Sequence, residues 1–432
     1  MGAAEGAGGA AASDPVVAVT GYARPMLPLL VGAALLLAAV LVLASGAATQ
    51  RHVAPRRPVV DPGIERWAAE IHRRLPSAFD AQNVTKAGPD RKGFRPRPRI
   101  VGHGDALEQG WRYSLNLPGN SEAGDWDPNR IAAALNHGDR IAAAAEIVAA
   151  GNGWADLSVW RRDPLDGEQP VPWRPGSIPT CVRPGSVCVG RRRDGEHIHF
   201  DIVRDGSALA TLIAGRRGSG KSETARLVVA QMCAWGWAPP TVVDLVRHGV
   251  DYTVFAPLLD RPIVTSPRDA VALVVELNAE ANERAEWMRA RGLQKITRFT
   301  PARPARPLVW DEVQSANDDK KLRAGLRRWT QQARPVGGAP LLITQYPTVE
   351  NIDSTLRAQI ANVWAGRCRN HVEAGVIFGP LPDGIGPHLL RTGPGSCVVD
   401  VDGPELLIGR SWSVPEAWYE AHVDRLAAVK VS

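Results

Sequence analysis

The segment GRRGSGKS (215–222) combines residue types that suit the binding of a polyphosphate. Its three glycines let backbone N–H groups converge on an anion without obstruction by side chains, and a helix that starts there adds the positive end of its dipole. Lys221 supplies a charge for the terminal phosphates, and the Ser222 hydroxyl is a ligand for Mg²⁺. The segment predicts an ATP site of the Walker A type. Its expected nucleotide-binding residues are Gly215, Arg216, Arg217, Gly218, Ser219, Gly220, Lys221 and Ser222.

An acidic pair follows the apolar run in RPLVWDEVQ (306–314), about 90 residues after the glycine-rich segment. A nucleoside-triphosphate site needs an acid at the end of a neighbouring strand. Asp311 is expected to hold Mg²⁺ through its water shell, together with Ser222. Glu312 is expected to polarise the attacking water as the general base.

Two further polar residues end apolar runs. Gln345, at the end of PLLITQ, is expected either to sense the γ-phosphate and orient water, or to be a strand-end residue in a turn. Asp244, at the end of TVVD, either lines the same edge or caps a loop.

The elements that must position these residues alternate between short apolar runs and helical stretches. Such alternation is typical of an α/β fold with a mainly parallel sheet covered on both faces. The expected strands lie at 208–214, 240–246, 307–311, 340–345 and 360–366.

Another kind of segment lies near the start of the chain. No ionisable side chain occurs between Leu27 and Gln50, and about 22 helical residues span the ~30 Å of a hydrocarbon core. We expect a disordered tail (1–24) and one transmembrane helix (25–50), with a cleaved signal peptide as the alternative. Basic residues follow the apolar run, which predicts a cytoplasmic C-terminal part. Residues 51–100, rich in Pro and Arg, are expected to form an extended linker.

A small α/β module is expected at 101–165. The segment GWRYSLNLPG (110–119) alternates apolar and polar residues as a half-buried strand does, and GWADLSVWRR (153–162) reads as a second strand. Asp127 and Pro128 suit the N-cap and first position of a helix. The five cysteines form no CxxC pair and have no histidines at ligand spacing, so we expect reduced thiols without a metal or disulfide role.

The motifs resemble those of the FtsK/SpoIIIE family of DNA-pumping ATPases. LIAGRRGSGKS is similar to the family's Walker A segment, LVWDEVQ to its Walker B segment, and ITQYPTVENIDSTLRAQIANVWAGRC to the segment that follows. EANERAEWMRARGLQKIT and GPGSCVVD also match. The departures are Tyr346, where the family has an arginine, and the absence of a lysine after Asp244. No winged-helix domain is expected after the motor.

The resemblance implies a P-loop NTPase motor with a RecA-like fold at 185–412, followed by a C-terminal tail (413–432). It also implies Mg²⁺ and ATP as cofactors, a homo-hexamer and double-stranded DNA in its pore. An arginine from a neighbouring subunit would complete each site. Arg367 is the chosen candidate, with Arg369 and the arginines at 323–334 as competitors.

The sequence therefore predicts a membrane-anchored, ATP-driven DNA translocase for conjugative transfer. It is expected as a single-pass protein of a bacterial cell membrane. The alternatives are a chromosome-partitioning DNA pump at division and a type VII-like protein-secretion ATPase.

Overall fold

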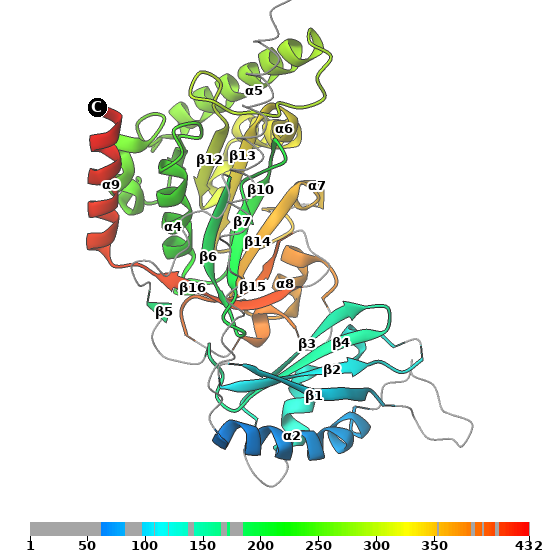
Figure 1. Cartoon of the computed structure of the whole chain (residues 1–432). Helices are drawn as coiled ribbons and strands as arrows, with labels where there is room; N and C mark the ends of the chain where they lie inside the picture. The colour runs from blue at the N-terminus through cyan, green and yellow to red at the C-terminus, as the bar shows by residue number, and fades with distance from the viewer. Residues whose placement is uncertain are drawn as a thin grey trace, which may run out of the picture. The chain divides into compact units, whose positions relative to one another are not determined.

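The computed structural model describes most of the chain after residue 61 (Figure 1). The described residues are 62–82, 97–107, 109–119, 121–136, 142–165, 171–172, 185–351, 354–381, 385–390, 393–401 and 406–431. The expected tail and transmembrane helix lie outside them. Among the residues described, none of the helices combines the length and apolar character that crossing a bilayer requires.

The first folded part contains an antiparallel sheet in the strand order β1-β2-β4-β3. Its strands are β1 (Arg99–Leu107), β2 (Gly110–Asn116), β3 (Ala144–Gly151) and β4 (Trp154–Trp160). The predicted strands at 110–119 and 153–162 correspond to β2 and β4. Helix α3 (Pro128–Leu135) starts as predicted, because the Asp127 carboxylate accepts hydrogen bonds from the backbone N–H groups of Asn129 (2.8 Å) and Arg130 (3.3 Å). A short 3-10 helix, η1 (Ala123–Asp125), precedes it.

Helix α2 (Pro62–Asp80) corrects the prediction of an extended linker over 51–100. Trp67, Ile71, Leu75 and Phe79 recur every fourth residue, and all four are buried against the sheet of the small module. The Tyr113 hydroxyl, from β2, also donates a hydrogen bond of 2.7 Å to the carbonyl of Ala68. The linker prediction weighed proline and arginine content and missed this helical period.

The second folded part contains a larger sheet in the order β11-β12-β13-β10-β14-β15-β16-β6-β7. Its first five strands are parallel, and all five were predicted. They are β10 (Ala210–Ala214), β11 (Thr241–Asp244), β12 (Arg306–Asp311), β13 (Gly338–Thr344) and β14 (Ile360–Gly366). Because parallel strands share one carboxyl edge, the residues that end β10, β11, β12 and β13 meet there.

The other half of this sheet is antiparallel, so the sheet is mixed rather than mainly parallel. Its strands are β6 (Ser186–Arg192), β7 (His197–Asp201), β15 (Ser396–Asp400) and β16 (Leu407–Ser413). The strands β6 and β7 lie before the part of the chain in which strands alternate with helices. They pair through a hairpin turn, and the apolar pattern does not distinguish such a turn from other loops. The two-residue strands are β5 (Val171–Pro172), which pairs with β16, and β8 (Val203–Arg204) and β9 (Ser207–Ala208), which pair with each other.

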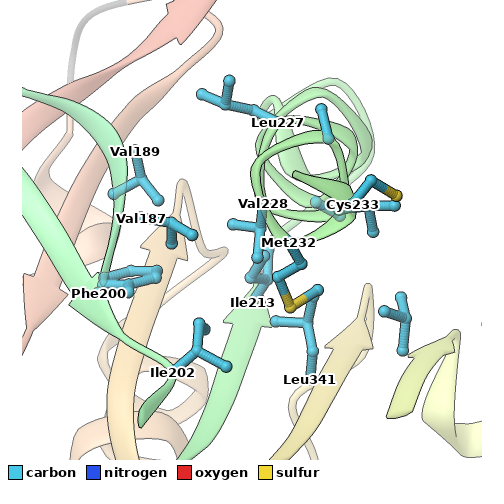
Figure 2. Packing of buried hydrophobic residues seen from close by; sticks show 14 of the residues in the cluster. Val187, Val189, Phe200, Ile202, Ile213, Leu227, Val228, Met232, Cys233 and Leu341 are labelled. Carbon is cyan, nitrogen blue, oxygen red and sulfur yellow. The ribbon is translucent and has the colours of Figure 1, made fainter. Parts of the chain in front are cut away.

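Helices cover both faces of the larger sheet, as predicted. Helix α4 (Lys221–Cys233) packs on one face, where Val228 and Met232 meet Ile213 and Leu341 of the strands (Figure 2). Helices α5 (Pro267–Arg289) and α6 (Lys320–Val336) pack on the other face. The shorter elements are η2 (Val250–Leu258), η3 (Val313–Asp318), α7 (Ser354–Arg357), α8 (His371–Phe378) and η4 (Pro387–Leu389).

The C-terminal residues are not a loose tail, because helix α9 (Glu416–Val431) packs on the core. Tyr419 is fully buried, and its ring lies edge-on to that of Phe255 at 5.6 Å between centroids. The Tyr419 hydroxyl also donates to the Glu223 carboxylate of α4 at 3.0 Å. The helix therefore supports α4, whose first residue is Lys221.

Candidate nucleotide-binding site

The glycine-rich loop joins β10 to α4, as the sequence predicted. Gly215 has φ +143°, and a Cβ there would lie 2.9 Å from the Ser219 hydroxyl oxygen. Gly220 has φ +101°, and a Cβ there would lie 2.8 Å from the backbone nitrogen of Gly395. An alanine at either position would meet both a strained backbone and a neighbour, so the loop needs these glycines to keep its shape.

The interior of the loop contains polar groups that suit an anion. Lys221 is buried, and its ammonium donates to the Arg216 carbonyl of the same loop at 3.2 Å. Burial lowers the Lys221 pKa, and the nearby Glu312 and Asp311 oppose that shift. The buried hydroxyl of Ser219 has no hydrogen-bond partner among the described residues. A bound phosphate would satisfy both groups, so these residues fit the predicted nucleotide.

Asp311 ends β12 on the same edge and is only 5% exposed. The Tyr252 hydroxyl donates to its carboxylate at 3.1 Å. Burial, followed by the negative charges of Asp244 and Glu312, raises the Asp311 pKa to about 6. Strand β13 lies between β10 and β12, so the acid is one strand further from the loop than expected.

Glu312 is held by the residues that follow β12 and β13. Its backbone is left-handed (φ +54°), which turns the chain sharply after the strand. Its carboxylate accepts hydrogen bonds from the Gln345 backbone N–H (3.1 Å) and the Gln345 side-chain amide. The Gln314 side-chain amide donates to it as well. Gln345 therefore contacts the predicted general base directly, a pairing that the sequence did not indicate.

Asp244 caps a loop, which was one of the two alternatives. Its carboxylate accepts hydrogen bonds from the backbone N–H groups of Val246 (3.1 Å), Arg247 (2.8 Å) and Gly249 (2.8 Å). It also acts on Asp311 electrostatically, as described above. The cap fixes the loop that leads into η2, where Tyr252 lies.

Arg367 follows β14 and is exposed beside the phosphate loop of its own chain. Its carbonyl accepts a hydrogen bond from the Arg216 N–H at 3.0 Å. The side chains here surround a cavity of about 260 Å³. The lining residues are Arg216, Arg217, Gly218, Ser219, Arg367, Gly393, Pro394 and Ser396. The expected role of Arg367 in the site of a neighbouring subunit stays a prediction.

The turn before β15 supports the phosphate loop from the other side. The Gly395 N–H donates to the Ser219 carbonyl at 2.9 Å, and the Ser411 N–H donates to the Gly395 carbonyl at 2.8 Å. The Ser411 hydroxyl accepts hydrogen bonds from Thr224 of α4 (2.9 Å) and from the Trp364 indole (2.8 Å). These supports come from distant parts of the chain. The sequence identified the segment GPGSCVVD, which contains Gly395, but it did not indicate that the segment contacts the phosphate loop.

Together these groups make a site for the hydrolysis of a nucleoside triphosphate. The loop N–H groups and Lys221 suit the phosphates, Ser222 and Asp311 suit a metal ion, and Glu312 suits the deprotonation of water. Ser222 and Asp311 would hold Mg²⁺, which when bound would neutralise charge on the phosphates. The fold and the site define a P-loop ATPase domain.

Comparison with known proteins places the domain more narrowly. Residues 176–365 match the model of the FtsK/SpoIIIE family. The DNA translocase FtsK of Chlamydia muridarum is 24% identical over 216 residues, or 44% of this chain and 27% of that protein. The DNA translocase FtsK of Bradyrhizobium diazoefficiens is 23% identical over 243 residues, or 45% of this chain and 28% of that protein. The chain thus spans little more than a quarter of these relatives.

One solved structure is similar over most of both chains. It is the pCW3 conjugation coupling protein TcpA, in a monomer form with ATPγS, with a TM-score of 0.53 and 17% identity. The similarity covers 83% of this chain and 99% of that chain. At this identity it shows that the two chains share a fold.

Proposed function

We propose that this protein is an ATP-driven translocase of double-stranded DNA that acts in conjugative transfer. The match to the FtsK/SpoIIIE family model and the relatives named as DNA translocases support DNA as the cargo. The conjugation coupling protein that shares the fold supports transfer between cells as the setting. The observation that carries the DNA part of the proposal is the charge of helix α6.

Helix α6 contains only basic charged side chains, and they lie on its exposed face. A row of cations of this kind contacts a polyphosphate backbone without reading bases, as a translocase requires. The exposed cations of the helix are Lys320, Lys321, Arg323, Arg327, Arg328 and Arg334.

The first turn of α6 is where the helix dipole disfavours positive charge. Lys320, Lys321 and Arg323 lie there, and each cation at a helix N-terminus costs about 0.3–1 kcal/mol. The N-cap carboxylate of Asp319 offsets part of this cost, and an anionic partner on this face would offset more. The charge distribution therefore favours a binding surface over an ordinary solvated helix.

The position of α6 connects this surface to the ATP site. The helix follows β12 and η3, which contain Asp311 and Gln314, and it leads into β13, which Gln345 follows. Since Gln345 and Gln314 both hold Glu312, a shift of α6 would change the surroundings of the general base. We therefore expect DNA that binds α6 to stimulate ATP hydrolysis.

The test is ATP hydrolysis by the purified full chain with double-stranded DNA, single-stranded DNA or a secreted peptide. Double-stranded DNA should stimulate turnover, with a steep loss of stimulation as salt rises. Lys321→Glu and Arg328→Glu should each reduce the stimulation and leave basal turnover unchanged. Arg268→Glu is the matched control, because Arg268 is exposed in the first turn of α5.

The reversal at Lys321 places a carboxylate where the dipole favours one, so unfolding would not explain a loss. Stimulation by the peptide alone would support the protein-secretion alternative instead. Stimulation by DNA that survives both reversals would remove α6 from the proposal.

We also propose a membrane anchor within residues 25–50 and a hexameric ring. The uncharged segment Leu27 to Gln50 supports the anchor. Fractionation of cells should place the full chain in membranes and a chain without residues 1–50 in the soluble fraction, with ATPase activity kept. A full chain found only in the soluble fraction would contradict the anchor. Light scattering with ATP and DNA would measure the molar mass of the assembly, which should correspond to six chains.

A further inference from the structure

Three potential metal ligands meet on the hairpin of β6 and β7, away from the phosphate loop in sequence. Cys188 and His199 are directly paired across the two strands, and His197 lies two residues before His199. Residues paired in this way, or two apart on one strand, share a face of the sheet. The Cys188 sulfur and one imidazole nitrogen of each histidine lie within 4.8 Å of one another.

We propose that Cys188, His197 and His199 form a binding site for one Zn²⁺ ion. A thiolate with two neutral imidazoles is a donor set that zinc favours, and the thiolate removes one positive charge from the site. Zinc bonds of about 2.0–2.3 Å at tetrahedral angles put neighbouring ligand atoms about 3.4–3.6 Å apart. Small side-chain rotations would bring the three ligand atoms from within 4.8 Å to this separation. A water molecule can be the fourth ligand.

Trp412 of β16 supports the cluster as outer-shell residues of zinc sites do. Its indole N–H donates to the Cys188 sulfur at 3.3 Å, and its ring lies edge-on to His197 at 5.5 Å between centroids. Such a donor stabilises a metal-bound thiolate and fixes its direction. Arg191 lies opposite His197 in the strand pairing, but its guanidinium is held by the Pro164 carbonyl at 3.2 Å.

The location gives the ion a structural role. β7 is the last strand of the sheet, so the hairpin has a neighbouring strand on one side only. The Gln231 side chain of α4 accepts a hydrogen bond from the Cys188 N–H and donates one to the Cys188 carbonyl, both at 2.9 Å. An ion at Cys188 would therefore fix the hairpin and, through Gln231, the helix that begins at Lys221.

The ligand spacing explains why the sequence did not indicate the site. Zinc motifs are recognised when ligands lie two to five residues apart on one segment. Here His197 and His199 are close on one strand, but Cys188 lies on the other. The turn between the strands and a register shift between Cys188 and Gly190 set which residues are paired. Only the paired hairpin brings them together.

The test uses the purified full chain, stripped with a chelator and then titrated with Zn²⁺ or Co²⁺. We expect one ion per chain by elemental analysis and, with Co²⁺, the charge-transfer absorption of a thiolate bond. Zn²⁺ should also raise the melting temperature. Cys188→Ser should abolish the absorption, and His197→Gln should weaken Co²⁺ binding at least about 10-fold. Cys233→Ser, a second buried thiol, is the matched control and should leave both unchanged.

Equal metal uptake by the wild-type chain and Cys188→Ser would overturn the proposal. A loss of metal binding in Cys233→Ser as large as the loss in Cys188→Ser would overturn it too. If circular dichroism shows that Cys188→Ser is unfolded, His197→Gln decides, because His197 is partly exposed and tolerates substitution better. Unchanged Co²⁺ affinity in a folded His197→Gln variant would then refute the site. None of these measurements depends on ATP hydrolysis.

Discussion

Replacement of Asp311 by asparagine should stabilise the nucleotide-free protein. Its pKa is raised from 3.8 to about 6, mainly by burial and then by the charges of Asp244 and Glu312. At about 1.36 kcal/mol per pH unit, ionised Asp311 costs about 3 kcal/mol of folding free energy at neutral pH. Asparagine has nearly the same shape and can still accept the Tyr252 hydrogen bond. We expect Asp311→Asn to recover much of this amount.

The gain should depend on pH with a defined sign. A carboxyl group with a raised pKa in the folded state takes up a proton on folding between about pH 4 and pH 6. Wild-type stability therefore falls as pH rises through this window, and the advantage of the variant appears above it. Below about pH 4 both states of the wild type are protonated at Asp311, and the advantage should vanish.

Equilibrium urea unfolding, followed by tryptophan fluorescence, measures the difference. Asp318→Asn, at an exposed carboxylate of η3, is the matched control and should change the free energy of unfolding by no more than about 0.5 kcal/mol. Mg²⁺ and ATP at about 100 times Kd should raise the free energy of unfolding of the wild type by about 2.7 kcal/mol and that of Asp311→Asn only a little. A variant no more stable than the wild type, or equally stabilised at every pH, would refute the reasoning.

The remaining predictions concern the other residues of the ATP site. Lys221→Ala should weaken ATP binding about 10- to 100-fold, because it removes a buried charged donor, and a titration that gives wild-type affinity would contradict the site. Glu312→Gln should keep ATP bound but slow hydrolysis about 10²- to 10⁴-fold, as loss of a general base does; wild-type single-turnover rates would place the base elsewhere. Gln345→Leu should lower kcat about 10-fold or more with little change in ATP affinity, since it frees the Glu312 carboxylate on one side, and an unchanged kcat would show that this contact has no part in turnover. Lys321→Ala, an exposed lysine, is a control for ATP affinity in all three titrations.

Much of the site could be predicted because its chemistry is local in the chain. The phosphate loop needs glycines, a lysine and a serine in one short segment, and the strand before it and the helix after it are visible as apolar patterns. Asp311 and Glu312 likewise follow a recognisable strand. The predictions failed where composition was used instead of period, as for α2, and where strands pair without a local signal, as for β6 and β7.

By itself, the sequence determined that the glycine-rich loop and the acids after β12 lie at one edge of the sheet, because a parallel sheet brings strand ends to one edge in any arrangement of its strands. The tertiary structure decided the hydrogen bonds from Gln345 to Glu312, the raised pKa of Asp311 and the meeting of Cys188 with His199. Each of these depends on strand order, burial or register between segments far apart in the chain. Such long-range contacts are fixed by packing, and no short segment encodes them.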